Sequence, residues 1–214
     1  MSAVVNAKKK NKLDAIGGES PTNGGKQAIE LGRPYIAKVT VRGVCDMLFN
    51  RYDCDAVAAK SNSAKGSAAR KMTDPETQVY RNDEKELCIP GEYFRRSIVL
   101  AAKFKQDPRS PRKSAMDLFN AGLTTLSPLC SLGLKEWHYL DRRRAIVGRA
   151  AVSRERPAIK AGWEAEVHLM VNLPEYIDRD LLHAVMTDAG RLVGVGDFRP
   201  SYGRYSIVGF QVEQ

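Results

Sequence analysis

Apolar residues occupy every second position from Tyr35 to Val41 in the segment PYIAKVTVRG, residues 34–43, and most of the positions between them are polar. This two-residue period, which starts at Tyr35, is typical of a strand that buries one face. The segment GWEAEVHLMVNL, residues 162–173, repeats the pattern, with apolar side chains at alternate positions from Trp163 to Val171. We therefore predict half-buried strands in both segments, and a further strand in the C-terminal YGRYSIVGFQVEQ.

Two segments show the spacing of a helix with one apolar face. In GEYFRRSIVLAAKFKQD, residues 91–107, this face runs from Phe94 to Ala102, and the prolines of DPRSPRK end the helix. In the second segment Asp178 is a suitable N-cap. The apolar positions that follow it at helical spacing are Leu181, Leu182, Val185, Ala189 and Leu192. We also expect a shorter helix near residues 115–120.

The remaining segments give less regular patterns. VYRNDEKELCIP, residues 79–90, has a turn cluster between two short apolar runs and predicts a hairpin. AIVGRAAVSRERPAI, residues 145–159, predicts one strand that joins the next near residues 161–162. Residues 126–140 show no pattern that assigns them, and the small, polar residues 56–73 predict a long mobile loop.

In order, the chain thus predicts strand, helix, strand, strand, helix, strand. This is the order of the ferredoxin-like fold, an α+β arrangement in which two helices cover one face of a four-stranded antiparallel sheet. We expect a single domain over residues 33–214, with insertions near 54–78 and 107–140. Residues 1–32 are polar and glycine-rich and are expected to form a flexible basic arm.

The charge is unevenly distributed along the chain. Lys and Arg number 34 against 25 Asp and Glu, a formal net charge of +9 that favours a polyanionic partner. Residues 91–113 carry seven basic and two acidic side chains, and residues 142–160 carry seven and one. Residues 161–190 carry one basic and six acidic side chains. A chain with this distribution can track phosphates with particular surfaces.

The composition argues against a metal site, a membrane span and the familiar catalytic motifs. Cys45, Cys54, Cys88 and Cys130 form no CxxC pair and have no histidine at the spacing of a zinc site. No apolar run is long enough to span a membrane or to serve as a signal peptide, so we expect a cytoplasmic protein. No Walker loop, GxSxG or HExxH occurs either. We expect neither a cofactor nor an enzymatic activity.

Arginines dominate the candidate contacts with a nucleic acid. Arg142, Arg143 and Arg144 precede the strand predicted at 145–159, along which alternate arginines would project from one side of the sheet. Such a run is often only a solvated face, but its density here favours a track for phosphates. The candidate residues on the predicted strands and first helix are Arg42, Arg95, Arg96, Arg142, Arg143, Arg144, Arg149, Arg154 and Arg156.

A second group of candidates follows the second predicted helix. Gly194 and Gly196 have no Cβ, so their backbone amides could approach a phosphate closely, and Arg199 and Arg204 would add charge there. Tyr202 could stack on a base. The alternatives are a turn after the helix for the glycines and core packing for the tyrosine.

Two further segments, CIPGEYFRR at residues 88–96 and GRLVGVGD at residues 190–197, resemble motifs of the repeat-associated mysterious protein (RAMP) superfamily of CRISPR systems. Residues 88–96, CIPGEYFRR, resemble the IPGSSLKG-A-R signature that opens the first helix of that superfamily. Residues 190–197, GRLVGVGD, followed by YGRY at 202–205, resemble its glycine-rich loop before the last strand. The match is partial, because Glu92 and Tyr93 replace small hydroxyl residues and Arg95 and Arg96 replace a Lys-Gly step.

The resemblance implies a protein that binds single-stranded RNA or DNA and forms a helical or arc-shaped homo-oligomer along the strand, as CRISPR backbone subunits do. Other CRISPR-type or phage recombination subunits are further expected partners. The sequence is also similar to uncharacterised phage and prophage proteins, so a freestanding phage-encoded relative fits equally well. A phage structural or assembly protein with a basic surface remains an alternative.

A RAMP-type endoribonuclease is the enzymatic alternative. Such relatives use a histidine as general base, and this chain offers His138, His168 and His183. None of them follows the first strand, where those endonucleases tend to carry theirs. Asp46 and Asp53, near the loop after the first strand, could in principle assist metal-dependent RNA cleavage, but two aspartates in a polar loop do not make a site.

Overall fold

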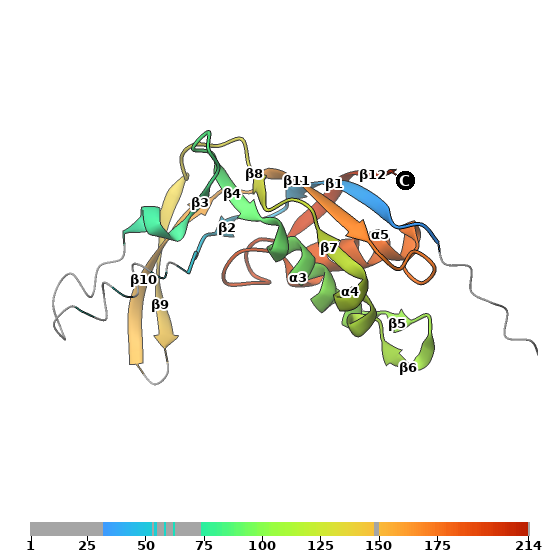
Figure 1. Ribbon diagram of the computed structural model, residues 1–214. Helices are drawn as coiled ribbons and strands as arrows, with labels where there is room; N and C mark the ends of the chain where they lie inside the picture. Colours follow the sequence, from blue (N-terminus) through green and yellow to red (C-terminus); the bar gives the residue numbers. More distant parts are fainter. Residues whose placement is uncertain are drawn as a thin grey trace, which may run out of the picture.

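The chain has an α+β fold with antiparallel sheets, in a computed structural model that describes residues 32–52, 54, 58, 62, 74–147 and 150–213 (Figure 1). The predicted α+β class is confirmed. Most of the predicted N-terminal arm, and all of the predicted loop 56–73 except residues 58 and 62, lie outside the described residues.

The largest sheet has four antiparallel strands in the order β12-β1-β11-β7, and we call it the main sheet. Its central strands are β1 (Tyr35–Gly43) and β11 (Glu164–Val171), and its edges are β12 (Tyr205–Glu213) and β7 (Leu123–Thr125). The predicted alternation is confirmed, because every second residue of β1 and of β11 is buried. Val39 lies opposite Val167 in the register, so the apolar sides of both strands face the same way.

The helices cover the buried face of the main sheet. Helix α3 (Gly91–Ala101) buries Phe94 and Ile98 as predicted, and the short helix α4 (Met116–Gly122) packs beside it. Helix α5 (Arg179–Asp188) begins at Asp178, whose side chain accepts a hydrogen bond from the Leu181 amide at 2.7 Å. The predicted N-cap is therefore present.

Helix α5 continues into η3 (Ala189–Val193), a π-helical turn. The wider turn changes the angular spacing of the side chains, so the apolar stripe predicted from helical spacing is not maintained to its end. Ala189 is buried, but Leu192, predicted on the same face, is 39% exposed.

Smaller elements connect these layers. The predicted hairpin at 79–90 is present as β3 (Tyr80–Arg81) and β4 (Leu87–Pro90), and β8 (Leu129–Ser131) pairs with β4. At the far end of α3, η2 (Ala102–Phe104) leads into a hairpin of β5 (Gln106–Asp107) and β6 (Ser110–Ser114). The 3-10 turn η1 (Pro75–Gln78) precedes β3.

The prediction of one strand at residues 145–159 is wrong. The chain instead makes two strands, β9 (Tyr139–Val147) and β10 (Ala150–Ile159), which pair with each other. Apolar residues continue on both sides of Gly148, so the sequence pattern gives little sign of the reversal. Along the chain, the strand that follows β1 in the main sheet is β7, which comes from the segment 107–140, predicted to be an insertion.

The β9–β10 hairpin projects from the rest of the domain (Figure 1). It is attached through β2 (Met47–Leu48), which pairs with Ala158 and Ile159 at the base of β10. The predicted turn near 161–162 is present, because Gly162 has φ +94° between β10 and β11. In the described part of the chain, no helix combines the length and the apolar character that crossing a membrane requires.

Candidate nucleic-acid interface

Residues 194–204, which we call the glycine loop, connect η3 to β12 through a tightly fixed backbone. Gly203 has φ +70°, and a Cβ there would lie 1.7 Å from the Val195 carbonyl oxygen, so only glycine fits. The Val195 amide donates to the Gly203 carbonyl at 2.9 Å, and the Asp197 amide donates to the Leu48 carbonyl at 2.9 Å. The loop is thereby attached to β2, and through β2 to the hairpin.

Two arginines of the hairpin hold the glycine loop by their side chains. Arg156 of β10 is 4% exposed, its Nε lies 2.5 Å from Asp197 Oδ2, and its Cζ lies 4.5 Å from the centroid of the Phe198 ring. Arg143 of β9 donates to the Tyr202 hydroxyl, and its Cζ lies 4.6 Å from the Tyr202 ring centroid. Cation–π contacts of this kind stabilise the packing of the two side chains when they are partly desolvated. Tyr202 thus packs against an arginine, and its stacking on a base stays a prediction.

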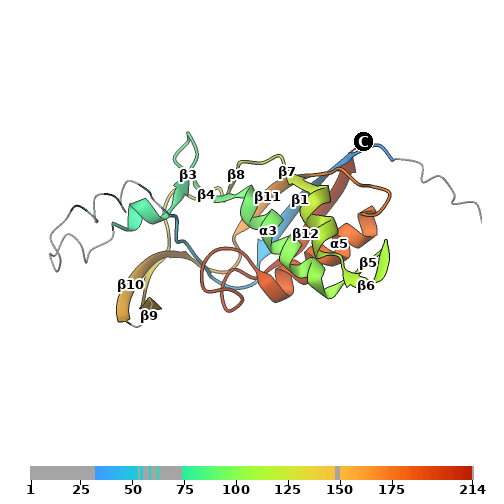
Figure 2. The same ribbon diagram turned by 60° about the horizontal axis from the view of Figure 1, so that its bottom comes forward.

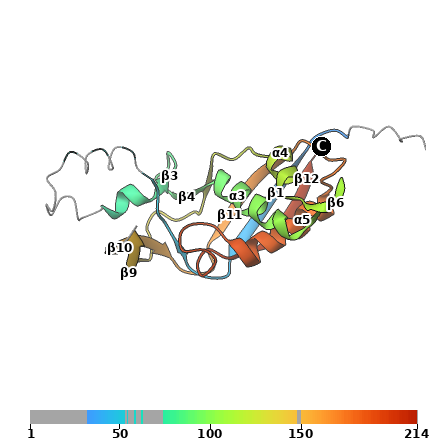
Figure 3. The ribbon, with the colours of Figure 1, turned by 90° about the horizontal axis from the view of Figure 1, so that it is seen from below.

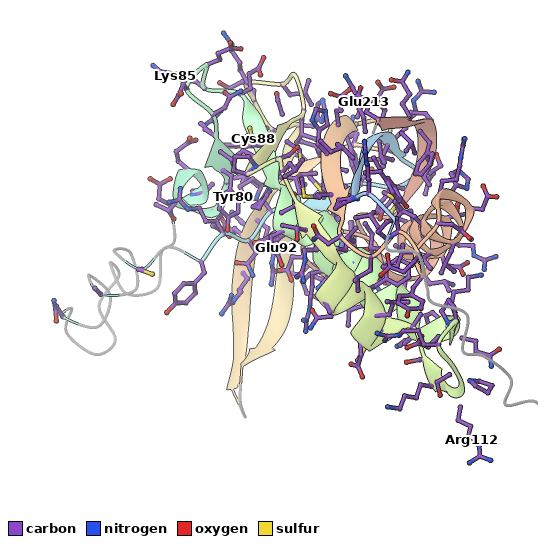
Figure 4. The ribbon with its side chains drawn as sticks, turned by 45° about the vertical axis from the view of Figure 1, so that its right-hand side comes forward. Tyr80, Lys85, Cys88, Glu92, Arg112 and Glu213 are labelled. Atoms are coloured by element: carbon purple, nitrogen blue, oxygen red, sulfur yellow. The ribbon has the colours of Figure 1, made fainter. Side chains whose placement is uncertain are left out.

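The glycine loop lies between the hairpin and α3 when the molecule is seen from two directions (Figures 2 and 3). Arg199 and Asp197 act electrostatically on Tyr93 in the first turn of α3, which places the loop near this end of the helix. Burial and the hydrogen bond with the Tyr80 hydroxyl, at 3.2 Å, raise the pKa of Tyr93, so its phenol stays neutral. Figure 4 shows Tyr80 and Glu92 on the neighbouring elements β3 and α3.

Three exposed arginines border this region, and we call them the arginine surface: Arg96 of α3, Arg154 of β10 and Arg199 of the glycine loop. None of them forms an ion pair with another residue that the structure describes. Arg96 lies one helical turn from Tyr93, and Arg154 shares a side of β10 with Arg156. Charges without a partner are available to phosphates.

Other predicted arginines are engaged within the chain. Arg95 donates to the carbonyls of Leu123 at 2.7 Å and Asn120 at 2.6 Å, so it fixes α3 against α4 and β7.

Two further predicted arginines form ion pairs within the chain. Arg42 pairs with Glu164, and Arg142 pairs with Glu155, each at 2.6 Å. Arg204 is exposed at the start of β12, and its backbone pairs with Val44.

Two predicted arginines are described only in part or not at all. The backbone of Arg144 lies opposite Ser153 in the hairpin, and Arg149 lies outside the described residues.

The predicted glycines have structural reasons for being glycine. The Gly194 amide donates to the Ala189 carbonyl at 2.8 Å, and the residue has φ +75°. Gly196 has φ +79°, and a Cβ there would lie 2.7 Å from the Leu48 carbonyl oxygen. Both positions therefore fit the turn alternative, and contact of either amide with a phosphate stays a prediction.

The open face of the main sheet, which the helices do not cover, has a different charge arrangement. Lys38 pairs with Glu166 at 3.2 Å, and Glu166 also accepts from His168 at 3.0 Å. Arg42 pairs with Glu164 across the same two strands. The side-chain hydrogen bonds from His168 and then from Lys38 lower the pKa of Glu166, which keeps this face ion-paired.

The candidate catalytic residues are dispersed. Asp46 uses both oxygens, accepting from the Tyr139 hydroxyl at 2.7 Å and the Ala161 amide at 2.9 Å, and Asp53 lies outside the described residues. His138, His168 and His183 lie before β9, on β11 and on α5. Nowhere in the described ranges do three His, Cys, Asp or Glu side chains gather in a way that could hold a metal ion.

Phe198 is the site residue that sequence reasoning missed. Phe198 is 37% exposed and has φ +54°. Both properties depend on how the glycine loop folds onto the hairpin, which the sequence does not show. The segment DFRP gives a single signal, an aromatic residue beside an arginine in a loop.

Comparison with known proteins finds similarity only at the level of solved structures. No family model matches the chain, and no curated protein matches it. Among solved structures, the chain is similar to one from the cryo-EM structure of the type III-B Cmr-beta bound to cognate target RNA, with a TM-score of 0.47 and 9% sequence identity. The match covers 85% of this chain and 61% of that one, so the chain spans less than two thirds of that protein.

Proposed function

We propose that the protein binds single-stranded nucleic acid across the arginine surface, between the β9–β10 hairpin, the glycine loop and α3. The observation that carries the proposal is the contrast in charge between two sides of one domain. Arg96, Arg154 and Arg199 have no acidic partner among the described residues, whereas Lys38 and Arg42 on the open face are paired. Phosphates are the partners that such unpaired arginines attract.

We also propose that the main sheet with α3 and α5 is a ferredoxin-like core. The chain passes through β1, α3, β7, β11, α5 and β12, and the strands lie in the order β12-β1-β11-β7. Antiparallel pairing of all four strands supports this assignment. Together with the two sequence motifs, at 88–96 and 190–205, it supports membership of the RAMP superfamily.

The binding test compares two variants with the same net charge. In the first, Arg96, Arg154 and Arg199 are changed to Gln. In the second, Lys38, Arg42 and the exposed Lys85 are changed to Gln; Figure 4 shows Lys85 at the β3–β4 turn. Fluorescence anisotropy with a labelled single strand, measured over a range of salt concentrations, gives the affinity and its salt slope.

The slope should fall in magnitude by about 0.7 for each phosphate that the protein no longer neutralises, which amounts to about 2 for the first variant. The second variant should keep the slope of the unchanged protein, because its lysines and arginine lie away from the strand. Equal decreases in the two variants would show that binding follows net charge and not this surface.

We further propose, from the resemblance to CRISPR backbone subunits, that several copies bind side by side on a long strand. A head-to-tail contact that does not close on itself produces an open filament. The acidic segment 161–190 offers Glu164, Glu166 and Asp180 as candidates for one side of this contact. These three residues do not form one continuous surface, because Glu164 and Glu166 lie on the open face and Asp180 lies in the first turn of α5, on the other side of the sheet.

Light scattering with a long homopolymer tests assembly separately from binding. A mass of many subunits for each strand at saturating protein is expected. One subunit for each strand would remove the filament proposal and leave the binding proposal standing.

A further inference from the structure

Phe198 occupies a backbone conformation that a bulky residue rarely adopts. Its φ is +54°, in the left-handed region, where an aromatic side chain is an outlier. The conformation is held on both sides, since the Phe198 amide donates to Asp197 Oδ1 at 3.0 Å and its carbonyl accepts from the Tyr202 amide at 3.2 Å. Strained residues of this kind cluster at functional sites.

A second unusual feature lies directly against the same ring. The Cζ of Arg156 is 4.5 Å from the Phe198 ring centroid, and its Nη1 is buried with no hydrogen-bond acceptor among the described residues. Buried donors without an acceptor are rare in proteins. Arg143 lies further out, with its Cζ 5.8 Å from the same centroid.

The two features together support and orient one aromatic ring at the surface. Arg156 covers a face of the ring from inside the protein, and the side chain remains 37% exposed. Arg199 follows Phe198 in the chain, and Arg154 lies two residues from Arg156 on β10. Two arginines without an ion pair among the described residues are thus next to Phe198 and next but one to Arg156 in the sequence.

We propose that Phe198 is a stacking platform for one nucleobase of the bound strand, which rests on the proposed function. Bases stack on aromatic side chains of single-strand binding proteins without sequence preference, because every base has a π-face. Arg156 and Asp197 act as positioning residues, since they fix the ring and do not reach the strand themselves. The glycine loop then contributes a ring to the strand as well as the charge of Arg199.

The competing role for Phe198 is an apolar plug that closes the base of the hairpin. Phe198→Leu separates the two roles, because leucine keeps apolar bulk over Arg156 but has no flat ring. Phe104→Ala is the matched control, because Phe104 is also exposed, at 54%, and also lies against a cation, Lys103, with Nζ 4.8 Å from its ring centroid. Thermal melting of each variant reports whether it is folded.

Removal of the ring should weaken binding of a short single strand by about 5- to 150-fold, the range for one stacked base. Phe198→Ala and Phe198→Leu should both show this weakening, with the salt slope unchanged because every phosphate contact remains. Phe104→Ala should bind normally. A strand with 2-aminopurine at successive positions should show quenching at one position, and Phe198→Leu should abolish it.

Binding by Phe198→Leu equal to that of the unchanged protein would overturn the stacking platform. The proposed function would survive that result if the change of Arg96, Arg154 and Arg199 to Gln still lowered the salt slope. Absence of any binding by the unchanged protein at low salt would overturn both.

Discussion

The open face of the main sheet and the side formed by the hairpin and glycine loop contain the same types of charged residue in opposite arrangements. On the open face, Lys38 and Arg42 lie within hydrogen-bond distance of Glu166 and Glu164 across adjacent strands. On the other side, the acidic groups Asp141 and Asp197 are used by Arg143 and Arg156, which hold the loop.

This difference shows why a net charge of +9 does not by itself locate a binding surface. Each side contains several basic residues, but those of the open face are neutralised within the chain. The three arginines of the arginine surface have no such partner among the described residues and are open to an external anion. The count of arginines in a segment matters less than the number left unpaired after folding.

The largest expected effect is the difference in stability lost when a buried ion pair, rather than an exposed one, is broken. Arg156→Met should lower the free energy of unfolding by about 3 kcal/mol, because it leaves Asp197 half-buried without its cation. Arg42→Met removes a pair whose side chains are 57% and 48% exposed, and should cost about 1 kcal/mol or less. Urea denaturation measures both. Equal destabilisation by the two changes would contradict the distinction between the two sides.

The next effect concerns the backbone of the glycine loop. Gly203→Ala should destabilise the protein by about 2 kcal/mol or more, since it combines a left-handed φ with a severe contact to the Val195 carbonyl. Gly133→Ala is the control, because Gly133 has φ +65° but open space around the position of a Cβ. A melting temperature of Gly203→Ala as high as that of Gly133→Ala would show that the loop backbone is not tightly fixed.

The smallest effect is a pH dependence on the open face. His168 and Lys38 lower the pKa of Glu166 below its ordinary value in the folded protein. The stabilisation that the ionised Glu166 provides is therefore complete above the pKa of Glu in the unfolded chain, about 4.3. It is lost as the pH falls through the lower pKa of Glu166 in the folded protein. Glu166→Gln should flatten the acid side of the stability profile by about 1 kcal/mol or less, since the side chain is 45% exposed. A steeper acid side of the profile in the variant would contradict the lowered pKa of Glu166.

Local periodicity was sufficient to predict the strands and helices that bury one face. The alternation of β1 and β11 and the apolar face of α3 follow from short-range patterns that do not depend on the rest of the chain. The β9–β10 hairpin could not be predicted from periodicity, because two arginine-rich apolar strands joined at a glycine have the same pattern as one long strand.

The charge partners could not be predicted, because they depend on register between distant segments. Arg42 meets Glu164 across 122 positions, and Arg156 meets Asp197 across 41. Arg95 and Arg96 are adjacent and identical in type, yet one fixes α4 and β7 and the other is free among the described residues. The placement of Phe198 on Arg156 depends in the same way on how the glycine loop closes.

Photo-crosslinking tests the central claim most directly, namely that a strand lies on the hairpin and loop side and not on the open face. A single strand containing 4-thiouridine would be irradiated in complex with the full chain, and the attached peptides identified by mass spectrometry. Crosslinks should fall in peptides from the glycine loop, β10 and the first turns of α3. Crosslinks concentrated in β1 and β11 would place the strand on the ion-paired face and contradict the account.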